Sequence, residues 1–140
     1  MNYWIIKTEP NKWSWHDQKR SKITMWDGVR NYQARNNLIA MKKKDYCFFY
    51  HSVNEKKIVG IVSIIKEYYP DPTDKTKKFV AVDIKVDRSL VSPITLSQIK
   101  NEKKLSHIAL VKQGRLSVMP IDKKSWGLLC QMGKVKITKN

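Results

Sequence analysis

Residues 45–68 read DYCFFYHSVNEKKIVGIVSIIKEY, and this stretch decides the fold class. Its two halves, residues 45–52 and 57–68, are rich in aromatic and β-branched side chains, and the polar turn Val53-Asn54-Glu55 separates them. This pattern predicts two strands joined as a hairpin. The second half is almost continuously apolar, so we expect it to be buried on both faces.

The flanking segments add further strands. Residues 3–8 (YWIIKT) predict a short buried strand, and residues 79–87 alternate between apolar and polar side chains, which is typical of a half-buried antiparallel strand. Short strands are also expected at residues 110–111 and 117–119. Helices are expected after four N-cap residues: Ser14, Asn31, Thr95 and Asp122. The pattern indicates an α+β fold, a small barrel-like sheet of mostly antiparallel strands with flanking helices.

The composition describes one basic globular domain. The chain has 140 residues, of which 41% are hydrophobic, and its 28 Lys and Arg against 12 Asp and Glu give a net charge of +16. Such a charge favours polyanionic partners, nucleic acid first and an anionic membrane surface second. Only five of the basic residues are Arg, however, and Lys is abundant together with Ile and Asn. Coding DNA rich in A and T explains that bias equally well.

Several classes of protein are disfavoured. The longest apolar run has eight residues, whereas a membrane span needs about 20, and the N-terminus lacks a signal-peptide pattern. Cys47 and Cys130 form no disulfide or zinc pattern, and His16, His51 and His107 are isolated in the sequence. We therefore expect a cytoplasmic monomer that uses no metal or cofactor, does not bind membranes and carries no visible catalytic motif.

One polar segment stands out. Residues 26–38 (WDGVRNYQARNNL) place two arginines, four amides and two aromatic rings around a helix start. Amide side chains can read base edges, aromatic rings can stack on bases, and a helix N-terminus attracts anions. The alternative is that Asn31 merely caps the helix and the other side chains solvate it. Two weaker candidates are residues 48–52, an aromatic strand with a polar end, and residues 112–117, where Arg115 follows a turn glycine.

The order of the motifs resembles the EVE domain family. The matching segments extend from Tyr3 to Trp126 and include YWIIKTEP (3–10), WDGVRNYQARNNL (26–38), FYHS (49–52), IVGIV (58–62), YPDPTD (69–74) and ALVKQGRLSV (109–118). The resemblance implies a β-pseudobarrel of the PUA-like superfamily over residues 1–133, followed by a short basic tail at 134–140. It also implies non-enzymatic binding of a modified nucleobase, with modified cytosine in DNA or RNA as the expected ligand.

The resemblance further implies a pocket that holds a base taken out of the stack. YTH domains, which are similar in arrangement, have a cage tryptophan at the position of Trp26. The expected base-binding residues are Lys7, Thr8, Trp26, Arg30, Asn31, Tyr50, His51, Ser52, Arg115 and Ser117. The expected phosphate contacts at the mouth are Arg35, Lys42, Lys43 and Lys44. Met119 stands where the family usually carries Gln, which bears on ligand preference if that position touches the ligand.

Two other functions remain open from the sequence. An enzyme acting on RNA or nucleotides would need an acid–base group, and His51 is the candidate beside the expected pocket. A generic RNA-binding protein would use the charge alone, and its affinity would fall steeply with salt without any preference for a base modification.

Overall fold

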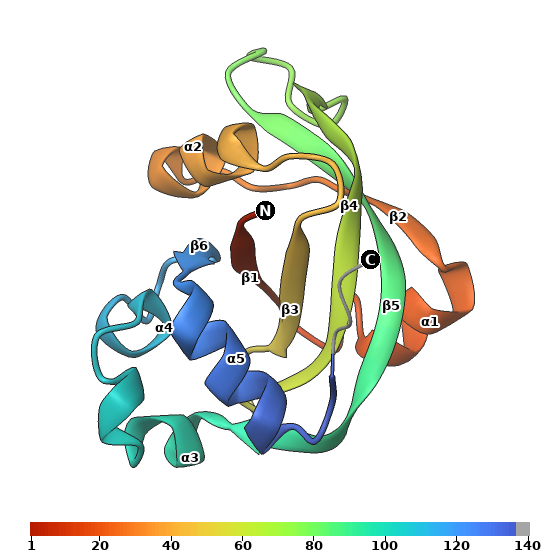
Figure 1. Ribbon diagram of the computed structural model, residues 1–140. Helices are drawn as coiled ribbons and strands as arrows, with labels where there is room; N and C mark the ends of the chain where they lie inside the picture. The colour runs from red at the N-terminus through yellow and green to blue at the C-terminus, as the bar shows by residue number, and fades with distance from the viewer. Residues whose placement is uncertain (137–140) are drawn as a thin grey trace.

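The structure, a computed structural model, describes residues 1–136. Within that range six strands form one sheet in the order β2-β5-β4-β3-β1-β6. The strands are β1 (Tyr3–Thr8), β2 (Ile23–Trp26), β3 (Tyr46–His51), β4 (Lys57–Pro70), β5 (Val80–Thr95) and β6 (Val118–Ile121). Figure 1 shows the long strands β4 and β5 curving side by side around the molecule. The expected α+β fold, a small barrel-like sheet of mostly antiparallel strands with flanking helices, is confirmed.

Strand pairing explains the curvature. The predicted hairpin is present as the antiparallel pair β3 and β4, and β4 pairs with β5 through several register shifts. Extra residues at such bulges bend a strand and increase its twist, which lets a single sheet close towards a barrel. β1 and β3 are parallel neighbours, with Tyr3 opposite Tyr46 and Thr8 opposite His51. The carboxyl ends of these two strands therefore meet at one end of the sheet.

Short helices cover the sheet. They are α1 (Trp15–Ser21), α2 (Tyr32–Ala40), α3 (Leu96–Lys100), α4 (Ala109–Lys112) and α5 (Lys123–Met132), with a 3-10 turn η1 (Lys103–Leu105). The N-caps are confirmed, because each predicted side chain accepts a bond from a backbone N–H in the first turn of its helix: Ser14, Asn31, Thr95 and Asp122. Each such cap contributes about 1 kcal/mol.

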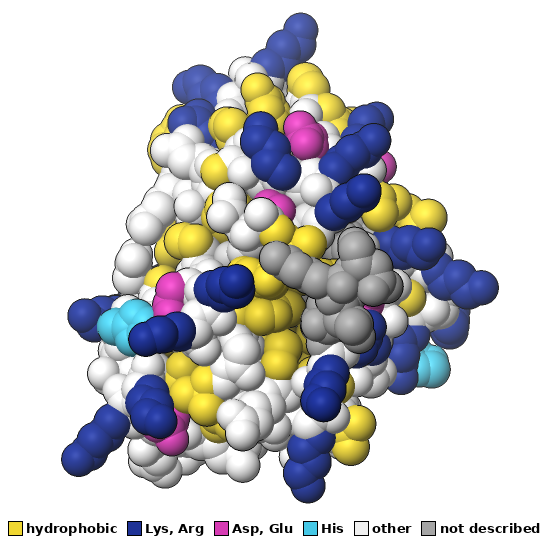
Figure 2. All heavy atoms as spheres, viewed as in Figure 1, with side chains coloured by type: hydrophobic (Ala, Val, Ile, Leu, Met, Phe, Trp, Pro, Cys, Tyr) yellow, Lys and Arg dark blue, Asp and Glu magenta, His cyan; other side chains and the backbone are white. Residues whose placement is uncertain are grey.

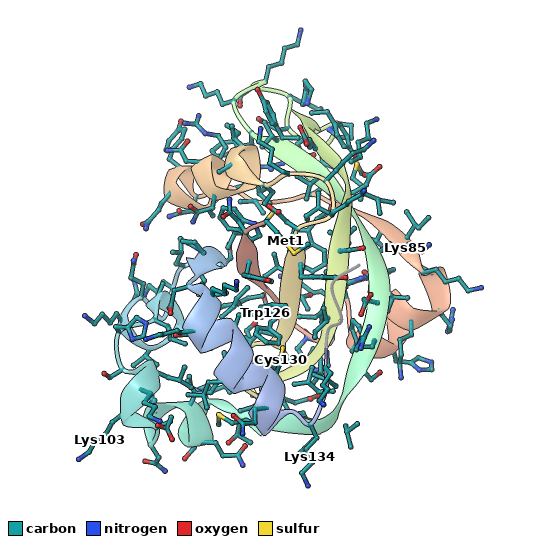
Figure 3. The ribbon with its side chains drawn as sticks, viewed as in Figure 1. Met1, Lys85, Lys103, Trp126, Cys130 and Lys134 are labelled. Carbon is teal, nitrogen blue, oxygen red and sulfur yellow. The ribbon has the colours of Figure 1, made fainter. Side chains whose placement is uncertain are left out.

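One part of the core lies between the sheet and α5, and the same buried cluster continues to residues of α1, β2 and α2. From α5, Trp126 and Cys130 point towards β3 in Figure 3, and the Trp126 ring stacks on Phe48 with ring centroids 4.0 Å apart. Its stacking on Tyr3, at 4.6 Å, extends the contact to β1. Rings of this size dominate core energetics because each buries a large apolar area. The packing fixes β1 and β3 relative to each other, and so fixes the end of the sheet where both strands stop.

Two details differ from the sequence predictions. Residues 110–111 form part of helix α4 rather than a strand, and the segment that pairs with β1 is β6, which starts at Val118. Strand β2 was not predicted, since its four residues pair with β5 without an alternating burial pattern. Of the basic tail predicted at 134–140, the last four residues lie outside the described range. Among residues 1–136, no helix is long and apolar enough to cross a membrane.

Candidate functional site

A cleft opens where β1 and β2 end. Its volume is about 600 Å³, which is in the usual range for small-ligand sites. Four segments form it: the end of β1, the loop before α1, β2 with the turn that leads to α2, and the residue before β6. The lining residues are Lys7, Thr8, Lys12, Trp13, Thr24, Met25, Trp26, Asp27, Gly28, Val29, Arg30, Asn31 and Ser117.

Tryptophan side chains form two parts of the lining. Trp26, the last residue of β2, is 8% exposed and packs edge-on against Phe49, with ring centroids 5.6 Å apart. Trp13 is fixed from the other side, because its indole Nε1–H donates to Gln18 Oε1 at 2.9 Å. Both rings are held by contacts outside the cleft, so they are in place before a ligand arrives. A planar aromatic ligand such as a nucleobase suits surfaces of this kind.

The wall between Trp26 and α2 is held by a buried carboxylate. Asp71 Oδ2 accepts bonds from the Gly28 N–H at 2.8 Å and from Arg30 Nη1 at 3.0 Å. Oδ1 accepts from the backbone N–H and the hydroxyl of Thr73, at 2.7 and 2.6 Å. Gly28 has a φ of +80°, which glycine adopts without strain. Burial works to raise the pKa of Asp71, but the bonds from Thr73, Gly28 and Arg30 outweigh it and hold the pKa below its usual value.

The polar groups around the cleft differ in the hydrogen bonds that they can still form with a ligand. Asn31 Oδ1 accepts the Ala34 N–H at 2.8 Å as the cap of α2, which leaves the Asn31 amide NH₂ as a donor. Asp27 is exposed and adds a carboxylate acceptor. Lys7 Nζ donates to the Gly114 carbonyl at 2.8 Å, and burial lowers the pKa of this lysine. The cleft therefore offers both donors and acceptors beside its aromatic lining.

The structure brings six of the ten expected base-binding residues to this cleft: Lys7, Thr8, Trp26, Arg30, Asn31 and Ser117. The other four do not line it, although Tyr50 and Ser52 contact residues that do. The Tyr50 ring is buried, 5.6 Å from Lys7 Nζ, and the Ser52 N–H donates to the Thr8 carbonyl. Arg115 is exposed in the turn before β6. The fourth of these, His51, is buried at the carboxyl end of β3.

His51 joins α1 to the sheet. Its Nε2 accepts the Trp15 N–H at 2.9 Å, and its Nδ1 lies 3.0 Å from Glu55 Oε1. The contact with His51 lowers the pKa of the Glu55 carboxyl. Both ring nitrogens are thus engaged, and the side chain is 7% exposed. The enzyme alternative needed His51 as an acid–base group beside the pocket, whereas His51 does not line the cleft and both of its ring nitrogens contact Trp15 and Glu55.

The expected phosphate contacts separate into two places. Lys42, Lys43 and Lys44 lie just before β3, at its amino end, whereas the cleft is at the carboxyl end of the parallel neighbour β1. A six-residue strand spans about 20 Å, so these lysines do not surround the mouth as expected. Arg35 lies on α2, beside Lys78. Lys and Arg side chains are scattered over the face seen in Figure 2 rather than gathered at one place.

A second hollow, of about 860 Å³, lies at the start of α5. There His107 Nε2 is 2.8 Å from Asp122 Oδ1 and 3.2 Å from Ser125 Oγ. A serine hydrolase triad uses the two different nitrogens of its histidine for these two partners, whereas here one nitrogen faces both. Ser125 is moreover 2% exposed. The cluster caps α5, and residues 1–136 contain no group of three side chains suited to a metal ion.

Comparison with known proteins identifies the family. The EVE domain matches residues 2–132 of this sequence. The chain belongs to the EVE domain family. As an EVE domain it is 34% identical to mouse thymocyte nuclear protein 1, over 94% of this chain and 73% of the mouse protein.

Solved EVE domain structures share its fold. The NMR structure of Rpa0253 from Rhodopseudomonas palustris is 48% identical with a TM-score of 0.89, over 96% of this chain and 94% of that one. The crystal structure of human THYN1 in complex with DNA that contains 5-methylcytosine is 31% identical, also with a TM-score of 0.89. That similarity covers 98% of this chain and 100% of the human chain.

Sequence reasoning missed part of the site. Trp13, Met25 and Asp27 line the cleft without having been predicted. Asp27 was within reach, since it stands inside the polar segment at residues 26–38. The supporting role of Asp71 carried a weaker signal, an acidic residue between two prolines in a turn-forming loop.

Proposed function

We propose that this EVE domain is a binding module for a modified nucleobase in DNA or RNA, with a methylated cytosine as the favoured ligand, and that the base occupies the tryptophan-lined cleft. The observation that carries this proposal is the likeness to human THYN1 bound to DNA containing 5-methylcytosine, over 98% of this chain. The structure supports it with a pre-formed cleft at the end of β1 and β2. We infer binding without turnover, because His51 is occupied by structural contacts.

The polar groups of the cleft suit the edge of cytosine. Cytosine carries an exocyclic amino group, and carboxylates accept a hydrogen bond from this group in protein–DNA recognition. Asp27 supplies an exposed carboxylate in the cleft. It also carries carbonyl and ring-nitrogen acceptors, for which the Asn31 amide NH₂ and the Lys7 ammonium are suitable donors. The indoles of Trp13 and Trp26 then cover the ring surface.

The energies are compatible with binding of an extruded base. Taking a base out of a duplex costs a few kcal/mol, and less from a single strand. Stacking on an aromatic side chain returns about 1–3 kcal/mol per base. A buried methyl group adds about 0.8 kcal/mol, which corresponds to about a fourfold preference over the unmodified base.

The test is a binding titration with two short single-stranded oligonucleotides that differ in one methyl group on cytosine. The wild-type chain should bind the methylated strand about fourfold more tightly. Asp27→Ala should weaken binding of both strands. The matched control Asp87→Ala removes an exposed carboxylate on β5 outside the cleft and should leave both affinities unchanged. Equal affinity of the wild-type chain for the two strands would contradict the proposal.

A further inference from the structure

Four side chains form a continuous stack that starts at the cleft. The Arg30 guanidinium lies 5.5 Å from the Phe79 ring centroid, and the Phe79 and Tyr32 rings stack at 5.1 Å with an interplanar angle of 28°. The Arg35 guanidinium follows, 4.8 Å from the Tyr32 ring. We call these four residues the arginine–aromatic ladder. Because Arg30 also lines the cleft, the ladder extends the site outward onto α2.

The two arginines of the ladder are in different electrostatic states. Arg30 is paired with the buried carboxylate of Asp71, so its charge is compensated within the protein. The hydrogen-bond partners of Arg35 within residues 1–136 are neutral oxygens, Asn36 Oδ1 at 2.8 and 3.1 Å and the Lys78 carbonyl at 3.4 Å. Arg35 is therefore held in position by its neighbours while its charge stays available to an anion. Such a pre-positioned guanidinium loses little conformational freedom when it binds phosphate.

The surroundings of Arg35 add charge and apolar surface. Lys75, Lys77 and Lys78 are all exposed in the loop between β4 and β5 that carries Phe79. Tyr32 is 53% exposed although it is a large aromatic side chain. Proteins hold a nucleic acid strand without reading its sequence by two features, cationic side chains that bind phosphates and exposed aromatic rings that stack on bases. Both features occur together here.

We propose that the arginine–aromatic ladder is the docking surface for the nucleotides next to the extruded base. Arg35 and the loop lysines bind the phosphates of these nucleotides, and Tyr32 packs against a sugar or base. Arg30 acts as the link, since it is fixed by Asp71 and borders both the cleft and the ladder. The inference rests on the proposed function, because it takes the cleft as the place of the modified base. It assigns the path of the strand to α2 rather than to Lys42, Lys43 and Lys44 at the far end of β3.

The test compares ligands with and without flanking nucleotides. One probe is the 5-methyl-2′-deoxycytidine nucleoside, and the other is a single-stranded oligonucleotide with one central 5-methylcytosine. The variants are Arg35→Gln and Tyr32→Ala, and Lys103→Gln is the charge-matched control on η1, which Figure 3 shows well away from α2. Arg35→Gln should weaken oligonucleotide binding about threefold or more and reduce the slope of log K against log salt by about 0.7 for each lost phosphate contact. Tyr32→Ala should weaken it without changing the slope.

Nucleoside affinity separates the two proposals. If the ladder binds the flanking strand, both variants keep the wild-type affinity for the nucleoside, and Lys103→Gln keeps the wild-type affinity for both probes. Loss of oligonucleotide affinity in Lys103→Gln equal to that in Arg35→Gln would overturn the ladder proposal, because net charge alone would then explain the effect. A third outcome is that the wild-type chain binds methylated and unmethylated strands equally, while Arg35→Gln, but not Lys103→Gln, weakens oligonucleotide binding. That result would refute the base-binding function and retain the ladder as a strand-binding surface.

Discussion

Replacing Asp71 by Asn isolates the carboxylate that shapes the cleft wall. The substitution keeps the size of the side chain but turns one acceptor oxygen into an amide donor. Both oxygens of Asp71 accept two bonds each, Oδ2 from Gly28 and Arg30 and Oδ1 from Thr73. If the new NH₂ group faces Gly28 and Arg30, it meets two groups that cannot accept, and both hydrogen bonds are lost. If it faces Thr73, the bond from the Thr73 N–H is lost while the hydroxyl can turn to accept, and the bonds that remain no longer go to a charged oxygen.

The size of the effect follows from the burial of these partners. A hydrogen bond to a charged group contributes about 1.5–3 kcal/mol. The Arg30 side chain is 41% exposed, so solvent reduces its share towards the value of about 0–1 kcal/mol typical of surface pairs. The Gly28 bond keeps its full value because the Asp71 side chain is completely buried, at 0% exposure. We expect Asp71→Asn to lower the free energy of unfolding by about 2–4 kcal/mol, or the melting temperature by about 10 °C.

The assay is thermal unfolding by circular dichroism, repeated as a function of pH. The Asp71 carboxyl has a lowered pKa in the folded chain, so its stabilising contribution is present above about pH 4 and is lost as the pH falls through the folded value. The difference between wild type and Asp71→Asn should therefore shrink below about pH 4. Asp87→Asn, which changes an exposed ion pair with Arg88, is the matched control. Equal melting temperatures for the two variants at neutral pH would show that the bonds to the Asp71 carboxylate do not stabilise the fold.

The remaining predictions concern the core. Gly60→Ala should destabilise the fold by about 1–3 kcal/mol or more in urea unfolding, because the new Cβ would lie 2.2 Å from the buried Trp15 ring, whereas Gly127→Ala, with open space at its Cβ, should not. An unchanged Gly60→Ala midpoint would show that the ring moves freely. Burial raises the pKa of Cys47 far above its usual value and that of Cys130 to about 11, so a thiol reagent at pH 8 should label neither until the chain unfolds. Rapid labelling of the native chain would contradict this.

Local signals in the sequence predicted much of the fold. The features that they did not predict depend on contacts between residues far apart in the chain. The caps at Asn31 and Asp122 depend on side chains three residues from their backbone partners, so the local sequence reveals them. The bond between Gly28 and Asp71 joins residues 43 positions apart and has no local pattern. Strand β2 is similar, since its pairing partner β5 lies far along the chain.

The candidate site divides in the same way. Trp26 and Asn31 lie within one motif, and the structure brings both to the cleft. Tyr50 and His51 were expected at the pocket because of the resemblance to the EVE domain family, but their side chains are buried among contacts with Lys7 and Trp15. Strand adjacency places two backbones side by side, but it does not determine whether their side chains share one cavity.

The central claim, that the cleft holds the modified base, is tested most directly by NMR of the tryptophan indoles. The chain contains five tryptophans, and each gives its own indole N–H signal. On titration with an oligonucleotide that carries 5-methylcytosine, we expect the signals of Trp13 and Trp26 to shift. The signals of Trp4, buried at the other end of β1, and of Trp126, which packs from α5 onto Phe48, should stay in place. Binding that leaves the Trp13 and Trp26 signals unchanged would show that the modified base does not occupy the cleft.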